Sequence, residues 1–455
     1  MTQFEGTFVQ QGDARYDELR VGHMFNRRIT TRQPPAVLLA ADEDDVVSGV
    51  RLAAQNGWQV SVRAGGHSWA NWGIRDNALL IDVGAMKDMQ FDPSTNIASV
   101  TPAVAGATEL DSFLAERGRF FPVGHCESVG LGGFLLQGGQ GWHVRHYGWS
   151  CESIESIDAV LADGSKVRAS EEENSDLFWV ARGAGPGFPG VVTRFNLKTY
   201  PRPALVMDTR SFRLDALDEL LAWLQRILPT LDSRVEPTLV ATGLDVPLAE
   251  GVERPAGTVL LLHTTAVGES EGEITPLLAD FDACPVQALG RVRAVSDIPE
   301  QNRILGESNP EGFRWAADTT WTDASAAELA PALRKMWAHL PTKRTWSIWY
   351  GWTPRTDLPD MALSIEGLAN IAVYCCYESA DDDERMAEWV HNNMGDLAAR
   401  FGKGVYIGDT DFSRRPDRFV SDDNFVRVEK IRRKWDPTGL FCGWLINDDS
   451  KINIH

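Results

Sequence analysis

The chain has 455 residues, about three times the size of a typical domain, so its length predicts two or three domains. Hydrophobic residues make up 43% of it and charged residues 24%, which excludes a disordered or collagen-like protein. The formal net charge is −20 and no lysine- or arginine-rich run offsets it, which argues against nucleic acid as a partner.

The start of the chain and its cysteine content bear on the compartment. Residues 1–20 contain neither a basic n-region nor an apolar core, and no uncharged apolar stretch reaches the length of a membrane span. Six cysteines are too few for a disulfide framework in a chain of this length. We therefore expect a soluble, cytoplasmic protein without a membrane partner, and the sequence leaves its oligomeric state open.

The first 200 residues predict alternating strands and helices. Residues 42–56 predict a helix, because acids occupy the first turn, apolar residues recur on one face and Gly57 follows. The predicted strand 58–63 runs directly into a glycine-containing loop. Further predicted elements are strands at 78–83 and 97–101, a helix at 108–117, a hairpin of 154–161 with 166–170, and a strand at 191–200.

The pattern changes after Pro201-Arg202-Pro203, which predicts a boundary. Helices are predicted at 214–228, 381–400 and 424–435, and strands at 258–265 and 371–377.

Residues 315–352 hold six tryptophans. They can pack a core or wall a substrate pocket, and the sequence leaves both readings open.

The densest signal is GHCESVGLGGFLLQGGQGWHVRHYG, residues 124–148, with eight glycines. Glycine is needed where backbone passes close to another group or adopts a positive φ. So many glycines predict backbone amides that lie against a flat or anionic ligand. A second loop of this kind, Arg63–Ser68, follows a strand. The run at 185–190 matches a dinucleotide fingerprint only formally, because a strand-like segment follows it, and we expect no nicotinamide site.

Other reactive side chains give weaker signals. His143 and His146 have a spacing that could bind a metal on a helix, but they lack a clear carboxylate partner, and we predict no metal site. Cys375 and Cys376 lie in an apolar strand and are predicted to be core residues.

Two motifs together resemble a known family. Arg63-Ala64-Gly65-Gly66-His67-Ser68 and Gly124-His125-Cys126-Glu127-Ser128-Val129-Gly130 resemble the vanillyl-alcohol-oxidase superfamily with a PCMH-type FAD-binding domain. The closer likeness is to its berberine-bridge-enzyme-like and oligosaccharide-oxidase branch. The resemblance covers about residues 30–202 and resumes at 424–427 and 434–437.

This resemblance implies an α+β fold, in which a two-part FAD-binding domain of two α/β subdomains carries an inserted substrate domain of antiparallel sheet and helices. The implied segments are 1–205 for the first part of the FAD-binding domain, 206–404 for the substrate domain and 405–455 for the returning part.

The resemblance also implies FAD that is bicovalently attached through His67, at the flavin 8α-methyl carbon, and Cys126, at ring carbon 6. Taken singly, the two would be a structural histidine and a small buried thiol. Further residues implied to bind the cofactor are Arg63, Gly65, Gly66 and Ser68 at the pyrophosphate, Gly130, Gly133, Gly139 and Gly141 along the cofactor, Val191 near the adenine, Val129 at the flavin edge, and Asn424.

The substrate side departs from the family pattern. Trp69 stands where a substrate-contacting tyrosine is frequent, and Phe134 stands where alkaloid-oxidising members have a histidine. Tyr406-Ile407-Gly408-Asp409 occupies the segment in which a family tyrosine often serves as the base. We predict Tyr406 and Asp409 as candidate catalytic bases, with the alternative that Asp409 only caps a turn.

The implied activity is that of an FAD-dependent oxidase. It would remove a hydride from an alcohol, hemiacetal or amine carbon of a small-molecule or sugar-like substrate and reduce dioxygen to hydrogen peroxide. By the resemblance, a small valine at position 129 favours dioxygen as the acceptor. Two alternatives stay open: a flavin dehydrogenase or oxidative cyclase of natural-product metabolism, and a flavin-carrying binding protein without turnover.

Overall fold

Several helices and strands of the structure lie where local sequence signals predict them. Helix α2 (Glu43–Asn56) begins where the Asp42 side chain accepts the backbone N–H of Asp45 at 2.9 Å, and it ends at Gly57, whose φ is 68°. Strands β8 (Ile154–Val160) and β9 (Lys166–Ser170) form the predicted antiparallel hairpin.

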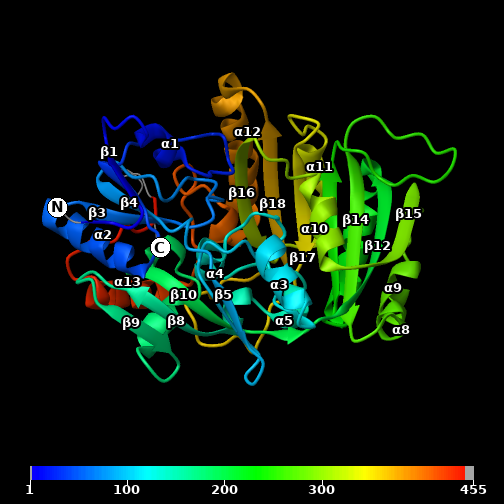
Figure 1. Cartoon of the computed structure of the whole chain (residues 1–455). Helices are drawn as coiled ribbons and strands as arrows, with labels where there is room; N and C mark the ends of the chain where they lie inside the picture. Colours follow the sequence, from blue (N-terminus) through cyan, green and yellow to red (C-terminus); the bar gives the residue numbers. More distant parts are fainter. Residues whose placement is uncertain (1–2, 446–455) are drawn as a thin grey trace.

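The structure is a computed structural model that describes residues 3–445, and in that range two sheets dominate the N-terminal part (Figure 1). The first is a four-stranded sheet in the order β1 (Thr7–Gln10), β2 (Ala36–Leu39), β4 (Ala78–Asp82) and β3 (Gln59–Arg63). The second is five-stranded, in the order β5 (Met89–Asp92), β6 (Ile97–Val100), β10 (Val191–Lys198), β8 and β9. A small ribbon pairs β7 (Arg119–Phe120) with β11 (Tyr200–Pro201).

A large antiparallel sheet forms the other side of the molecule (Figure 1). Its eight described strands run in the order β15 (Gly290–Ser296), β12 (Ala204–Arg213), β14 (Val259–Gly268), β13 (Val235–Thr242), β17 (Trp346–Gly351), β18 (Ala369–Tyr377), β16 (Arg314–Thr322) and β19 (Gly402–Gly404). Its back face packs in one apolar core with α7 (Leu217–Ile227), α11 (Ala326–Trp337) and α12 (Asp383–Phe401). The opposite, front face of the sheet therefore lies toward the N-terminal part of the chain.

The remaining helices are short, apart from α13 near the C-terminus. They are α1 (Tyr16–Val21), α3 (Asp111–Ala115), α4 (Leu131–Leu136), α5 (Val144–Tyr147), α6 (Ser175–Ala181), α8 (Glu271–Ile274), α9 (Ala279–Asp282), α10 (Ile298–Gly306) and α13 (Asp422–Trp435). None of the helices within residues 3–445 is long and apolar enough to cross a membrane.

The C-terminal segment returns to the N-terminal sheet. Val60 of β3 donates its N–H to the Leu440 carbonyl at 2.7 Å and accepts the N–H of Cys442 at 2.9 Å. The predicted helix at 108–117 differs from the structure: a π turn at Gly106–Leu110 precedes the short α3, because Leu110 donates its N–H to the Ala105 carbonyl five residues earlier. The α+β fold class is confirmed, whereas the domain boundaries at 205 and 405 stay a prediction, and residues 446–455 lie outside the described range.

Candidate active site

A cavity of about 910 Å³ lies between the N-terminal loops and the front face of the large sheet. Most of the predicted site residues line it. They are Arg63, Gly65, Gly66, His67, Ser68, Cys126, Val129, Gly130, Gly133, Tyr406 and Asp409. Four predicted residues do not line it: Gly139, Gly141, Val191 and Asn424.

The loop after β3 offers free backbone donors to the cavity. The backbone N–H groups of Gly65, Gly66, His67 and Ser68 donate no hydrogen bond within the described part of the chain. Consecutive amides of this kind form a concave site for an anionic group such as a pyrophosphate. Across the cavity wall, a Cβ added to Gly133 would meet no atom within 4 Å, so there is open space beside this backbone for a flat ligand. The loop and its neighbour therefore fit FAD.

Gly65 and Gly130 have a structural reason to be glycines. A Cβ on Gly65 would lie 2.3 Å from the Gly130 nitrogen, and a Cβ on Gly130 would lie 2.7 Å from the Gly65 Cα. The two cavity loops can therefore approach each other only because both positions lack a side chain.

The predicted role of the Arg63 side chain at the pyrophosphate is wrong. Its Nε and Nη2 donate to Asp82 Oδ2 at 2.9 and 2.6 Å. Its remaining N–H groups donate to the carbonyls of Leu19 (2.6 Å), Arg20 (2.6 Å) and Val21 (3.1 Å). All five guanidinium donors are thus used by the protein. Arg63 holds the N-terminal residues against β3 and β4.

We expect Arg63→Met to lower the free energy of unfolding by about 3–5 kcal/mol, because it leaves the buried Asp82 carboxylate without its partner. Denaturant unfolding of the purified protein measures this. The control is Arg194→Met, since the ion pair of Arg194 with Asp88 is partly exposed and should contribute about 0–1 kcal/mol. If Arg63→Met left the stability unchanged and weakened FAD binding, the predicted role of Arg63 at the cofactor would be correct.

The four predicted residues outside the cavity make packing or hydrogen-bonding contacts within the protein, and their role at the cofactor stays a prediction. A Cβ on Gly141 would lie 2.3 Å from the Pro122 carbonyl oxygen, and one on Gly139, whose φ is 77°, would lie 2.9 Å from the Ser150 Cβ. Val191 is fully buried in the core, and its neighbour in β10 faces the cavity, because successive strand residues point to opposite sides. Asn424 donates to two backbone carbonyls, of Met361 and Ala362.

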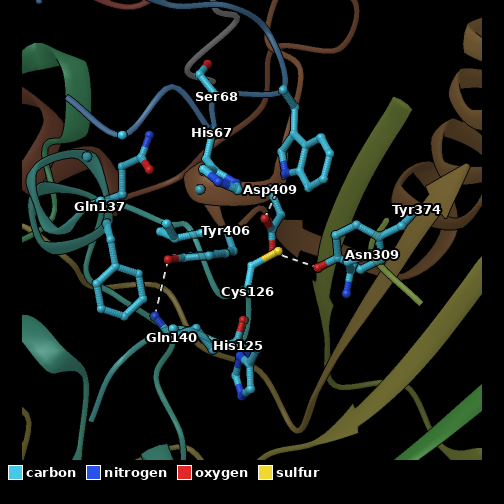
Figure 2. A pocket seen from close by; sticks show the side chains of 18 of the residues that line it. His67, Ser68, His125, Cys126, Gln137, Gln140, Asn309, Tyr374, Tyr406 and Asp409 are labelled. Carbon is cyan, nitrogen blue, oxygen red and sulfur yellow. Dashed lines mark hydrogen bonds between the residues drawn. The ribbon is translucent and has the colours of Figure 1, made fainter. Parts of the chain in front are cut away.

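His67 and Cys126 lie in the same part of the cavity, as Figure 2 shows. The His67 ring stacks on Phe25 with centroids 4.5 Å apart, and its Nε2 is 2.9 Å from Ser128 Oγ. Burial lowers the pKa of His67 to about 3, so the imidazole is neutral and keeps a nitrogen lone pair at neutral pH. Burial, and next the Asp409 carboxylate, raise the pKa of Cys126 to about 12, so it is a thiol rather than a thiolate.

Asp409 is held by two side chains from distant parts of the chain. Trp69 Nε1 donates to its Oδ1 at 2.9 Å. The Tyr374 hydroxyl of β18 donates to its Oδ2 at 2.7 Å, and Figure 2 labels both Tyr374 and Asp409. Burial raises the pKa of Asp409, and the two hydrogen bonds only partly oppose this. The alternative of a turn cap is wrong, because the carboxylate faces the cavity and accepts from these side chains.

Tyr406, the other predicted base, also lines the cavity, and its backbone carbonyl accepts the N–H of Asp409 at 3.2 Å. Its hydroxyl accepts the backbone N–H of Gln140 at 3.2 Å, and its ring packs on Trp149 at 5.5 Å. Burial raises its pKa, so it is a neutral phenol at neutral pH.

Tyr374 is a site residue that the sequence does not predict. Its strand was predicted as core, yet alternation along β18 turns Tyr374 to the cavity while Val373 and Cys375 face the back of the sheet. The predicted burial of Cys375 and Cys376 is confirmed. Both readings of the tryptophans hold in part. Trp346 lines the cavity and stacks on Tyr374 at 4.1 Å, and the other five are buried: Trp315, Trp321, Trp337, Trp349 and Trp352.

Comparison with known proteins agrees with this site. A family model described as an FAD binding domain matches residues 34–170. The FAD-linked oxidoreductase janO of Penicillium janthinellum is 34% identical over 434 residues, which cover 94% of this chain and 94% of that protein. Xylooligosaccharide oxidase of Thermothelomyces thermophilus is 40% identical over 182 residues, 39% of this chain and 36% of that protein. The crystal structure of 6-hydroxy-D-nicotine oxidase from Arthrobacter nicotinovorans has a TM-score of 0.84 at 20% identity, covering 98% of this chain and 99% of that one.

The fold and the cavity thus define a PCMH-type FAD-binding enzyme. The chain belongs to the FAD-linked oxidoreductases, as its two loop motifs predicted, and its fold is similar to that of berberine-bridge-enzyme-like proteins and oligosaccharide oxidases. The predictions of FAD as cofactor and of an oxidoreductase are confirmed.

Proposed function

We propose that the protein oxidises an alcohol or amine carbon and passes the electrons to dioxygen, with hydrogen peroxide as the product. The observation that carries this proposal is the Asp409 carboxylate, held by Trp69 and Tyr374 in the same part of the cavity as His67 and Cys126. Two relatives with a similar activity support the proposal: xylooligosaccharide oxidase and (R)-6-hydroxynicotine oxidase.

In this reaction FAD supplies the acceptor for the hydride. The proton of the substrate O–H or N–H must leave at the same time, and the Asp409 carboxylate receives it. A raised pKa suits this role, because a carboxylate that binds protons more tightly is a stronger base. The hydrogen bonds from Trp69 and Tyr374 occupy one site on each oxygen and fix the orientation of the carboxylate.

Aromatic side chains keep water away from this proton transfer. Trp69 packs against Phe25, Trp315 and Tyr374, with ring centroids 5.8–6.1 Å apart. These rings lower the local dielectric constant and strengthen the hydrogen bonds to the carboxylate.

The experiment that tests the function uses the flavin absorbance. Addition of a substrate without air should bleach the yellow protein, and admission of air should restore the colour and release hydrogen peroxide. The survey includes sugars, benzylic alcohols and cyclic amines. A protein that bleaches but recovers slowly in air is a dehydrogenase, and one that no compound bleaches is a binding protein.

Val129→Leu tests dioxygen as the acceptor. Val129 lines the cavity three residues after Cys126, at the predicted flavin edge, and a longer side chain there should obstruct dioxygen. We expect reoxidation of the reduced flavin to slow at least about tenfold, which corresponds to a rise of about 1.4 kcal/mol in the activation free energy. Reduction of the flavin by substrate should change little. Stopped-flow absorbance resolves the two steps. Equal slowing of both steps would indicate a general packing effect.

A further inference from the structure

The cavity continues along the front face of the large sheet to a region far from Asp409. Tyr374 pairs with Trp346 of β17, which pairs with Thr242 of β13. Glu236 lies six residues before Thr242 on β13 and also lines the cavity. At about 3.4 Å per residue this places Glu236 roughly 20 Å further along the sheet. A single cavity thus joins the reacting end to a distant polar one.

Two buried polar groups at this distant end have unused hydrogen-bonding capacity. Glu236 is 4% exposed, and its Oε1 accepts the backbone N–H of His143 at 3.2 Å. The Tyr350 hydroxyl is also 4% exposed and lies close enough to the Glu236 carboxyl to shift its pKa, yet within residues 3–445 neither Glu236 Oε2 nor this hydroxyl has a hydrogen bond of good geometry. Both residues line the cavity. A buried polar group that lacks a good hydrogen bond is destabilising, and a ligand in the cavity can recover this loss.

The charges around Glu236 favour a neutral ligand group. Burial raises the pKa of Glu236 to about 7, and hydrogen bonding from Tyr350, His143 and Arg145 and the positive charge of Arg145 only partly oppose this, so the carboxyl is partly protonated near neutral pH. The Arg145 guanidinium itself donates to the carbonyls of Val235 and Leu228. The positive charge of Arg145 compensates a Glu236 carboxylate and disfavours a second cation there. Burial lowers the pKa of His125 to about 4 and that of His143 to about 3, so both imidazoles are neutral.

The cavity wall between the two ends carries apolar side chains together with Thr238 and with His263, both of whose ring nitrogens already have partners in the protein. On the sheet, Val240 pairs with Leu261 on one side and Ile348 on the other, and all three line the cavity. A ligand that spans this stretch must itself be mainly apolar.

We propose that Glu236 and Tyr350 form a distal subsite that binds a neutral hydrogen-bond donor, a hydroxyl or an N–H, at the far end of an elongated and mainly apolar substrate. This inference rests on the proposed function, because it describes the other end of the molecule that is oxidised beside Asp409. The inferred substrate differs in class from oligosaccharides, because oligosaccharides carry hydroxyls along their whole length.

The test measures binding to the full-length, FAD-loaded protein without air. 1-Alkanols and α,ω-alkanediols of increasing chain length are titrated in matched pairs, and the shift of the flavin absorbance spectrum gives each Kd. At the chain length that reaches Glu236, we expect the diol to bind about tenfold more tightly than the alkanol, which corresponds to one good hydrogen bond. Bleaching reports turnover separately, so a failure of the proposed function is distinguishable from a failure of the subsite.

Variants assign the preference to the two residues. Glu236→Leu should reduce the diol-to-alkanol ratio to about one, and Tyr350→Phe, which keeps the ring, should reduce it partly. The control is Asp245→Asn, because Asp245 is a carboxylate at the cavity wall whose side chain is 89% exposed. If Glu236→Leu does not fold, Tyr350→Phe decides. The proposal is overturned if the diol has no advantage at any length, or if the advantage survives in both variants.

Discussion

Acid precipitation of the double variant His67→Ala/Cys126→Ala is expected to release all its flavin into the supernatant. The unchanged protein and each single variant should keep the flavin in the pellet, because one covalent bond is enough to retain it. Nε2 of His67 lies within hydrogen-bond distance of Ser128 Oγ, so Nδ1 is the nitrogen available for a bond to the flavin. The imidazole is neutral and therefore keeps a lone pair for this bond. Cys126 needs a base to become a thiolate, and Asp409 is the nearby carboxylate that affects its pKa most.

Gel fluorescence and peptide mass spectrometry identify the attached peptides. The control is Cys442→Ala, since Cys442 also lines the cavity but lies outside the two loop motifs. It should leave both attachments intact. If the unchanged protein releases all its flavin in acid, the bicovalent attachment is wrong, whereas FAD as the cofactor would stand.

Asp409→Asn is expected to slow flavin reduction at least about tenfold and up to the 10²–10⁴-fold that a positioned base contributes. Amide and carboxylate have the same shape, so the contacts with Trp69 and Tyr374 can largely persist while the proton acceptor is lost. Anaerobic stopped-flow absorbance with saturating substrate measures the rate. Tyr406→Phe is the matched comparison, because Tyr406 is the other predicted base that lines the cavity and phenylalanine keeps its ring. Slow reduction in Tyr406→Phe, with Asp409→Asn unaffected, would assign the base to Tyr406.

The rate of flavin reduction is also expected to depend on pH, and Asp409→Asn tests the origin of this dependence. Burial raises the pKa of Asp409 above its ordinary value of 3.8, and the carboxylate accepts a proton only when it is ionised. The reduction rate should therefore fall as the pH is lowered through this raised pKa and reach a plateau above it. Asp409→Asn should lose this acidic limb. An identical limb in the variant would assign the titration to another group.

Local signals explain how much of the site was predictable. His67 and Cys126 lie in short glycine-rich loops whose sequence can be recognised without the rest of the fold, and the close approach of Gly65 and Gly130 shows why those loops tolerate no side chain there. Helix α2 was predictable for the same reason, since its two ends are set by Asp42 and Gly57.

The role of Arg63 was not predictable from its loop. An arginine beside two glycines is typical of an anion site, but its five donors are used by Asp82 and by three carbonyls that lie 42 to 44 residues earlier in the chain. Only the folded N-terminal segment brings those carbonyls to it.

The sequence by itself therefore determined the family, the cofactor and the two loops that face it, because each depends on short-range patterns of glycine, histidine and cysteine. The tertiary structure decided which side chains surround the substrate. Trp69 and Tyr374 meet Asp409 from 340 and 35 residues away, and Glu236 and Tyr350 come from separate strands of one sheet. The register of strand pairing fixes these contacts, and register depends on how the whole sheet buries its back face, which no local pattern contains.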